Sequence, residues 1–276
     1  MEPVVGVVGL GAMGLAMGRR LVERGVPVIG TDTSPVRREL AAAAGVGIRD
    51  TATDTARDAR FLLVVVRTGE QVREVLTGLD GFTDTGDQRT CALLTSTVGP
   101  REARELQHLA ASHGVALLDA PVSGGVLGAA AGTLTVLLSG PAEDRLPAAG
   151  LLAHVANEVI DLGDDCGTAQ SAKIATQVML AFALQGAAEA TRLAVRLGLD
   201  ASRFLALAAH TDGRSWATDH PDVLRVMWDG DEGSRPIDLI CKDLDLARDA
   251  ALTGSVELPA TATVRSLISG AGDWDA

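Results

Sequence analysis

Cysteine and metal-binding patterns are scarce in this chain of 276 residues. The three cysteines, Cys91, Cys166 and Cys241, lie far apart, so they fit neither a disulfide framework nor the paired spacing of a zinc site. The five histidines include no HExxH-type pair. We therefore expect no metal and, because unpaired cysteines suit a reducing compartment, a cytoplasmic protein.

Clusters of basic residues and long apolar runs are also missing. The 24 basic and 36 acidic residues give a formal net charge of −12, and no clustered basic face is present, which argues against binding to nucleic acid. The apolar stretch at residues 4–18 is too short to span a bilayer and follows Glu2 and Pro3 rather than a basic region. We expect no membrane segment. The hydrophobic content of 47% instead indicates a globular protein with room for two domains.

A glycine-rich segment follows the first apolar run. Residues 4–8 read as a buried strand, residues 9–14 have the sequence GLGAMG, and helical periodicity continues to Gly25. In this order, Gly9 suits a tight turn and Gly11 allows backbone N–H groups to approach a pyrophosphate, while Gly14 allows close packing of helix on strand. The segment predicts a dinucleotide-binding site.

An acidic residue ends the second apolar run. Asp32 has about the spacing of a ribose-binding carboxylate. A carboxylate there favours NAD over NADP, because it repels a 2′-phosphate, but Arg37 and Arg38 follow closely and leave NADP open. The alternative is an ordinary turn before a helix that starts at Pro35.

Apolar runs alternate with helical patterns over the first part of the chain, which predicts an α/β fold with a doubly wound, mainly parallel sheet of the Rossmann type. From Gly167 the pattern is helical throughout, beginning with a long helix over residues 170–197. We expect a dinucleotide-binding domain at 1–164, an all-helical substrate and oligomerisation domain at 165–276, and a substrate cleft between them. The helical domain suggests a homodimer or tetramer. Expected strands cover 61–66, 91–95, 115–118, 133–138 and 159–162, and expected helices cover 35–44, 69–76, 100–113, 142–155, 201–209, 221–227, 237–252 and 259–269.

A second loop rich in small residues follows the strand expected at 115–118. Ser123, Gly124 and Gly125 offer a hydroxyl and closely spaced N–H donors, which suits a carboxylate or a phosphate. A plain glycine-rich turn is an equally good interpretation of these residues alone.

Four ordered segments together resemble the β-hydroxyacid dehydrogenase family: GLGAMG at 9–14, DAPVSGG and GTL within 119–134, GTAQSAK at 167–173, and KDL at 242–244. The resemblance implies an oxidoreductase that transfers a hydride between NAD(P) and a small 3-hydroxy acid, or reduces the matching semialdehyde. It implies that Lys173 is the catalytic acid/base, that residues 123–125 hold the substrate carboxylate, and that Lys242 reaches the cofactor or substrate. The expected cofactor-binding residues are Gly9, Leu10, Gly11, Ala12, Met13, Gly14, Asp32, Thr33, Val66, Arg67, Thr68, Ser96 and Lys242.

The expected catalytic group depends on the pKa of Lys173 and on one departure from the family pattern, Gln177. A lysine with an ordinary pKa near 10.4 is almost wholly protonated at neutral pH, so a basic role requires burial that lowers the pKa. Gln177 stands where the family has an asparagine, one helical turn after Lys173. Its amide still shares a helix face with the lysine, but the extra methylene moves it. We therefore assign Gln177 to the catalytic group and leave the particular hydroxy acid open.

Other departures from the family pattern leave further alternatives. Arg67 stands where the family commonly has a proline. Its side chain either contacts the cofactor or an anionic substrate, or it is an ordinary surface charge. Ser96 lines the nicotinamide pocket or caps the helix before Pro100. An imine reductase and a catalytically silent dinucleotide-binding protein are the competing functions. A decarboxylating sugar-phosphate enzyme is disfavoured, because the His-Asn pair expected after the lysine is absent.

Overall fold

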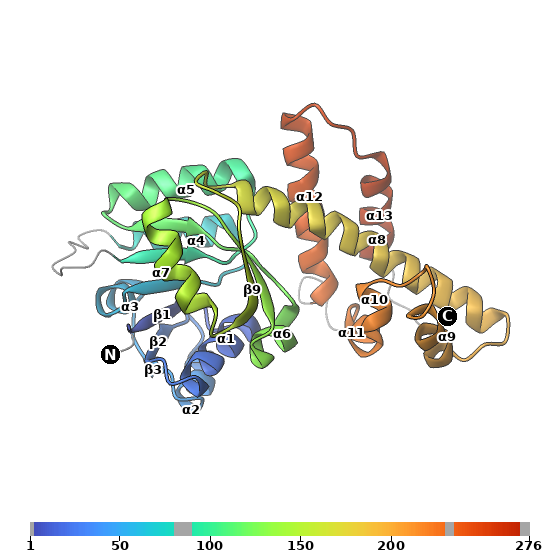
Figure 1. The fold of residues 1–276 in the computed structure, drawn as a ribbon, viewed down its shortest axis with the longest axis horizontal. Helices are drawn as coiled ribbons and strands as arrows, with labels where there is room; N and C mark the ends of the chain where they lie inside the picture. Colours follow the sequence, from blue (N-terminus) through green and yellow to red (C-terminus); the bar gives the residue numbers. More distant parts are fainter. Residues whose placement is uncertain (1–2, 80–89, 230–234, 271–276) are drawn as a thin grey trace. The chain divides into compact units, whose positions relative to one another are not determined.

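The computed structural model describes residues 3–79, 90–229 and 235–270 (Figure 1). The chain forms two compact units, residues 1–173 and residues 174–276. The division falls inside the long helix α8 (Thr168–Arg196), whereas the sequence placed a boundary near residue 164, before this helix. The start of α8 lies in the first unit, where the backbone N–H groups of Gly167 and Gln170 donate to Asp119.

A six-stranded sheet organises the first unit. All five neighbouring pairs are parallel, and the strand order β3-β2-β1-β4-β5-β6 reverses direction beside β1. This is the order of a Rossmann fold, whose ligands bind where the order reverses. The predicted doubly wound sheet is thus confirmed. Its strands are β1 (Val5–Val8), β2 (Val28–Thr31), β3 (Gly47–Ile48), β4 (Phe61–Val64), β5 (Cys91–Leu94) and β6 (Ala116–Asp119). Its helices are α1 (Ala12–Glu23), α2 (Pro35–Ala43), α3 (Ala52–Asp58), α4 (Gly69–Thr77) and α5 (Pro100–Ser112).

A separate three-stranded sheet follows in the same unit, with the order β7-β8-β9. The sequence assigned the last two of these strands to the main sheet, and that placement is wrong. The chain turns back after β6, so that β7 pairs antiparallel with β8, while β9 is parallel to β8. An isolated bridge between Asp119 and Ser139 joins the two sheets. The elements are β7 (Val122–Ser123), α6 (Gly125–Ala131), β8 (Leu134–Leu138), α7 (Ala142–Leu152) and β9 (Ala156–Asp161).

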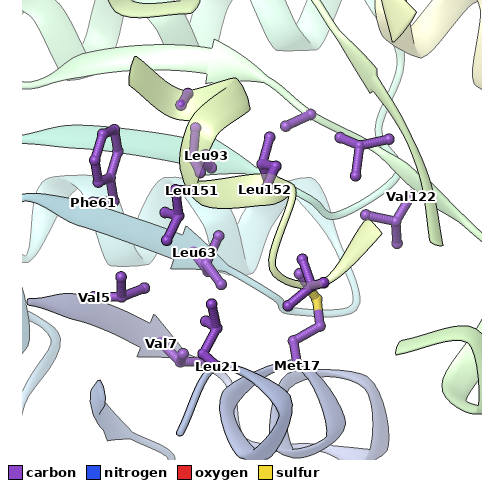
Figure 2. Packing of buried hydrophobic residues seen from close by; sticks show 14 of the residues in the cluster. Val5, Val7, Met17, Leu21, Phe61, Leu63, Leu93, Val122, Leu151 and Leu152 are labelled. Atoms are coloured by element: carbon purple, nitrogen blue, oxygen red, sulfur yellow. The ribbon is translucent and has the colours of Figure 1, made fainter. Parts of the chain in front are cut away.

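The main sheet is buried on both faces, as its continuous apolar strands require. Leu63 belongs to the core on one face and its neighbour Leu62 to the core on the other, because successive strand residues point to opposite sides. Figure 2 shows Leu21 of α1 and Leu151 of α7 lying around Leu63 on one face. Burial of each such side chain contributes about 1.5–3 kcal/mol to stability. The two cores hold the strand ends, and hence the loops that follow them, in fixed positions.

The second unit is helical throughout its described residues, 174–229 and 235–270, as the sequence predicted. A core that includes Leu184, Leu205, Leu224 and Leu244 holds its helices together. The indole N–H of Trp228 donates to the carbonyl of Ile268 inside this core (3.0 Å). Besides most of α8, the unit contains α9 (Ala201–Ala208), α10 (Trp216–Asp219), α11 (Pro221–Val226), α12 (Pro236–Thr253) and α13 (Pro259–Gly270).

Helix α8 is long and apolar enough to cross a membrane by length and composition alone. The core helix of a globular protein passes the same test, so this is weak evidence for a membrane. Ala181, Leu184 and Ala188 of α8 lie fully or almost fully buried in the helical core. Burial against other helices accounts for the apolar character of this part of α8.

Candidate functional site

The turn after β1 contains two glycines that the fold requires and a third, Gly11, that the fold does not require. Gly9 has a positive φ of 95°, and a Cβ at this position would lie 2.2 Å from the carbonyl oxygen of Val65. A Cβ on Gly14 would lie 1.9 Å from the carbonyl oxygen of Gly9. At Gly11, by contrast, a Cβ would meet only a guanidinium nitrogen of Arg37, at 3.8 Å. The space above Gly11 therefore suits a ligand that approaches the backbone.

Helix α1 supplies the electrostatic part of this turn. Gly11 is its N-cap and, having no side chain, makes no capping hydrogen bond. The N–H groups of the first helical turn and the positive end of the helix dipole thus meet the open space above Gly11. This arrangement binds phosphate groups in dinucleotide folds. The residues present fit the pyrophosphate of NAD(P).

Asp32 lies just after β2 and ties that strand to the glycine turn. Its Oδ2 accepts the N–H of Leu10 and its Oδ1 accepts the N–H of Ser34, both at 2.8 Å. The guanidinium of Arg37 lies 3.6 Å from Oδ2. The carboxylate of Asp32 and the guanidinium of Arg37 therefore lie side by side near the glycine turn. The carboxylate also fixes the backbone at Leu10 and Ser34. Its predicted contact with a ribose stays a prediction.

The ends of β4 and β5 are joined through a hydroxyl group. Ser96 donates from Oγ to the carbonyl of Val64 (3.2 Å) and accepts the N–H of Val66 (2.9 Å). It does not cap α5, because the N-cap of that helix is Gly99. Thr68 caps α4 by accepting the N–H of Gln71 (3.2 Å), while Arg67 is exposed next to it. Ser96 thus holds together the end of β4, which lies beside the point where the strand order reverses, and the end of its neighbour β5.

The loop predicted to hold a carboxylate lies at the end of β7. Ser123, Gly124 and Gly125 are exposed. Gly124 and Gly125 adopt φ values of 117° and 64°, which other residues reach only with strain. The glycines thus allow the chain to turn from β7 directly into α6 and leave its backbone open to a ligand. Whether the loop binds a substrate carboxylate stays a prediction.

Lys173 is the last residue of the first unit and is 7% exposed. One helical turn earlier, Gln170 is fully buried and donates from Nε2 to Oδ1 of Asp119 (2.7 Å). Asp119 is fully buried as well, and burial raises its pKa to about 6, although hydrogen bonds from Gln170, Gly167 and Ser139 lower it. Asp119 and Gln170 were part of the recognised motifs, but sequence reasoning gave them no role.

The second unit contains a smaller polar group. Gln177 donates from Nε2 to Oδ2 of Asp243 (2.7 Å), and both side chains are buried. Nζ of Lys242 lies 3.0 Å from Oδ1 of Asp243, an ion-pair distance without hydrogen-bond geometry. Asp243 thus brings the predicted residues Gln177 and Lys242 together. It was not predicted as a site residue, although the KDL motif contains it.

Metal ligands form no cluster in the described part of the chain, where no group of three or more His, Cys, Asp or Glu could hold an ion. The predicted residues gather in each unit separately. In the first unit, hydrogen bonds join Asp32 to Leu10 and Val66 to Ser96. In the second unit, Asp243 joins Gln177 and Lys242. These contacts describe the positions of the residues, and their roles toward a ligand stay predictions.

Known families match both units. The profile of the NAD binding domain of 6-phosphogluconate dehydrogenase matches residues 4–163. The profile described as NAD-binding of NADP-dependent 3-hydroxyisobutyrate dehydrogenase matches residues 167–274. Among relatives, the L-threonate dehydrogenase of Escherichia coli O6:H1 is 33% identical over 98% of this chain and 89% of its own length. Human mitochondrial 3-hydroxyisobutyrate dehydrogenase is 32% identical over 90% of this chain and 75% of its own.

Solved structures agree with these relatives. The 3-hydroxyisobutyrate dehydrogenase of Mycobacterium tuberculosis, solved with L-serine, has a TM-score of 0.80 and 32% identity over 98% of this chain and 93% of its own. Psf3 in complex with NADP+ and 2-OPP has a TM-score of 0.82 and 28% identity over 96% and 92%. An imine reductase from Pseudomonas sp. is 20% identical at a TM-score of 0.72 and shares the fold alone.

The glycine turn fits a dinucleotide, the sheet has the order of a dinucleotide-binding fold, and two family profiles together match most of the chain. Named hydroxyacid dehydrogenases align at about a third identity over nearly its whole length. This chain belongs to the β-hydroxyacid dehydrogenase family of NAD(P)-dependent oxidoreductases.

Proposed function

We propose that this enzyme oxidises a small 3-hydroxy acid, or reduces the matching semialdehyde, with Lys173 as the general acid/base. The supporting observation is the distribution of lysine: Lys173 and Lys242 are the two lysines of the whole chain, and every other basic side chain except histidine is arginine. Arginine stays protonated at any physiological pH and therefore cannot accept a proton. Lys173, moreover, is 7% exposed.

Bound NAD(P) supplies the hydride acceptor for oxidation and the donor for reduction. In oxidation, the neutral amine of Lys173 takes the hydroxyl proton as the carbinol becomes a carbonyl. In reduction, the ammonium form of Lys173 returns that proton to the forming alkoxide. Burial supports this role because it disfavours the charged form of an amine.

Residues 123–125 are proposed to bind the substrate carboxylate through the Ser123 hydroxyl and backbone N–H groups. The support is their exposure and the positive φ values of Gly124 and Gly125, which leave the backbone unobstructed. Gln177 is proposed to orient the substrate with its amide. Its hydrogen bond to Asp243 fixes that amide, and Asp243 also lies against Lys242, which is proposed to contact substrate or cofactor.

The cofactor is proposed to be NAD by preference, with NADP also accepted. Asp32 supports NAD because a carboxylate repels a 2′-phosphate. Arg37 supports acceptance of NADP, because its guanidinium lies 3.6 Å from Asp32 and over Gly11. Asp32 is also bonded to two backbone N–H groups, so its oxygens are only partly available to a ribose.

The test is an absorbance assay of the purified enzyme with NAD or NADP and a panel of short acids. The panel includes L-threonate, 3-hydroxyisobutyrate and L-serine, which the names of similar proteins suggest. Turnover of at least one hydroxy acid supports the proposal. Reduction of cyclic imines without any hydroxy-acid turnover supports an imine reductase instead, and cofactor binding without turnover in either direction supports a silent binding protein.

The enzyme is further proposed to be a soluble cytoplasmic homodimer or tetramer that assembles through its helical unit. Several large apolar side chains of that unit are more than half exposed, which is costly for a surface left in water. They are Met179, Leu193, Leu197, Leu207, Leu252 and Val256.

A further inference from the structure

The amide of Gln170 is held in one orientation by three partners. Nε2 donates to Oδ1 of Asp119 (2.7 Å) and to the carbonyl of Ser96 (3.0 Å), while Oε1 accepts the N–H of Val98 (3.1 Å). Turning the amide over would place NH₂ against the Val98 N–H and Oε1 against a carbonyl. Both Gln170 and Asp119 are fully buried, so neither can replace a lost partner with water.

The remaining acceptors of the cluster satisfy the start of α8. Oδ2 of Asp119 accepts the N–H groups of Gly167 and Gln170, both at 3.0 Å. Oγ of Ser139 accepts the N–H of Ala169 (3.1 Å) and lies 3.4 Å from the same carboxylate oxygen. The first N–H groups of a helix have no partner within the helix. At the start of α8, three of them donate to Asp119 and Ser139. The carboxylate also stabilises the positive end of the helix dipole.

Two segments that are distant in the sequence meet at this cluster. Gln170 fixes the backbone at Ser96 and Val98, and the hydroxyl of Ser96 is bonded to Val64 and Val66 at the end of β4. Gln170 and Lys173 are three residues apart in α8, so they lie on neighbouring positions of one helix face. A single buried amide therefore connects the helical turn that carries Lys173 to the ends of β4 and β5.

We propose that Gln170, held by Asp119, is a positioning residue that sets the place of the Lys173 amine relative to the ends of β4 and β5. This inference rests on the proposed role of Lys173. The proposed role of Gln170 requires no contact with substrate or cofactor, because the residue acts through the backbone of α8. Because proton transfer tolerates little displacement, loss of this connection slows the chemical step while the glycine turn still binds cofactor.

The first experiment compares Gln170→Leu with Gln185→Leu. Gln185 is a matched control, because it is also a buried glutamine of α8, but its amide donates to Glu189 on the same helix. We expect Gln170→Leu to lower kcat roughly ten- to a hundredfold, with cofactor Kd within about twofold of the wild type. Gln185→Leu should leave kcat within about twofold. Equal kcat losses in the two variants would overturn the proposal, because they would indicate a general effect of removing a buried amide.

The second variant, Gln170→Glu, keeps the shape of the side chain and makes it titratable. Its pH dependence tests the positioning role even if Gln170→Leu does not fold. A protonated carboxyl group can still accept the N–H of Val98 and donate to Asp119, whereas an ionised one faces the Asp119 carboxylate. The Cys166 thiol lies near Asp119 and is neutral, because burial raises its pKa to about 12, and Arg104 lies near Cys166 and Gly167. We expect the kcat of Gln170→Glu relative to wild type to rise about tenfold from about pH 8 to about pH 6. A constant ratio contradicts the proposal.

The third measurement needs no turnover. Because the chain contains two lysines, reductive methylation followed by peptide mass spectrometry reports on Lys173, with Lys242 as the internal reference. Gln170→Leu should raise the ratio of Lys173 to Lys242 labelling severalfold, and Gln185→Leu should not. An unchanged ratio overturns the positioning role. If the ratio changes while Lys173→Ala keeps wild-type turnover, the positioning stands and the proposed role of Lys173 fails.

Discussion

At the scale of single residues, arginine is common in this chain and lysine is rare. Arginine supplies surface ion pairs such as Arg19 with Glu23 and Arg57 with Asp54, where a permanent charge is useful. Lysine, which can lose its proton, is confined to Lys173 and Lys242. Because Lys173 is proposed to transfer a proton, a substitution that keeps only its charge tests that role.

Lys173→Arg keeps the cation but cannot act as a base. We expect its kcat to fall about as far as that of Lys173→Ala, roughly 10²- to 10⁴-fold, with cofactor Kd little changed in both. Steady-state kinetics and a cofactor titration of the two variants provide the measurement. An arginine variant that retains most of the activity would show that the position contributes charge rather than proton transfer.

Asp32→Ala removes the carboxylate proposed to select NAD. The ratio of kcat/KM with NAD to that with NADP should fall roughly tenfold, because the repulsion of a 2′-phosphate is lost. Arg37→Ala is the opposing control and should raise that ratio. Since Asp32 also accepts the N–H groups of Leu10 and Ser34, thermal unfolding of each variant is measured in parallel. An unchanged ratio in a folded Asp32→Ala protein would remove this residue from the cofactor site.

Asp119 makes stability depend on pH in an unusual direction for a carboxylate. Its pKa rises from 3.8 to about 6 in the fold, so the folded protein binds this proton more tightly than the unfolded chain. The stability contribution of the group is therefore complete below pH 3.8 and is lost as the pH rises through 6. The loss amounts to about 3 kcal/mol.

Urea unfolding of the wild type and Asp119→Asn over this pH range isolates the effect. Asparagine does not titrate, so its altered hydrogen bonds shift the curve by a constant amount. We expect the unfolding free energy of the wild type to fall by roughly 2 kcal/mol relative to the variant from about pH 4 to about pH 7. A pH-independent difference between the two proteins would show that Asp119 titrates at its ordinary pKa when folded.

At the scale of elements, the turn between β1 and α1 contains glycines of two kinds. Gly14→Ala places a methyl group 1.9 Å from a backbone carbonyl oxygen and should destabilise the fold by about 1–3 kcal/mol or more. Gly11 has an ordinary φ of −65° and open space, so Gly11→Ala should change stability by no more than about 1 kcal/mol. Instead, Gly11→Ala should raise cofactor Kd about tenfold or more, since the methyl group occupies the path of the pyrophosphate.

Calorimetric unfolding and cofactor titration of these two variants check both halves of the prediction. If Gly11→Ala binds cofactor as the wild type does, the open space above this glycine is not a ligand site. The glycine turn would then serve only to join β1 to α1.

Elements with strong periodicity could be predicted from the sequence, and short ones could not. The strands β4 and β5 and the helices α5 and α12 lie within a few residues of their expected bounds. The elements β3, β7 and α10 have two to four residues, too few to show a period. The wrong assignment of β8 and β9 to the main sheet has a different cause. The chain changes direction after β6 and begins a separate sheet. A pattern of apolar runs gives no information about such a change of direction.

At the scale of the whole molecule, some residues of the candidate site could also be predicted from the sequence and others could not. Residues inside contiguous motifs, such as Gly11 and Lys173, could be named from the sequence. The connection of Gln170 to Ser96, Val98 and Asp119 could not, because its partners lie 51 to 74 residues away. Likewise, the bond from Gln177 to Asp243 spans 66 residues. Such contacts exist only once the fold brings the segments together.

Assembly is also a property of the whole chain. The exposed apolar side chains of the helical unit predict association, so light scattering should give a mass of about two or four times 28.4 kDa. Replacing Met179 and Leu197, which are 73% and 74% exposed, by polar residues should shift the mass toward the monomer. A monomeric wild type at micromolar concentration would contradict the prediction and would leave these side chains without a partner.

The division of the chain inside α8, rather than before it, decides where this protein can be spliced to a homologue. A chimaera joined at residue 164 would pair a foreign helix start with the buried Asp119, whose Oδ1 accepts the side-chain Nε2 of Gln170. A crossover after residue 173 keeps donor and acceptor from the same parent. Recombination libraries that exchange helical halves for new substrate ranges should therefore retain far more folded members with the later junction.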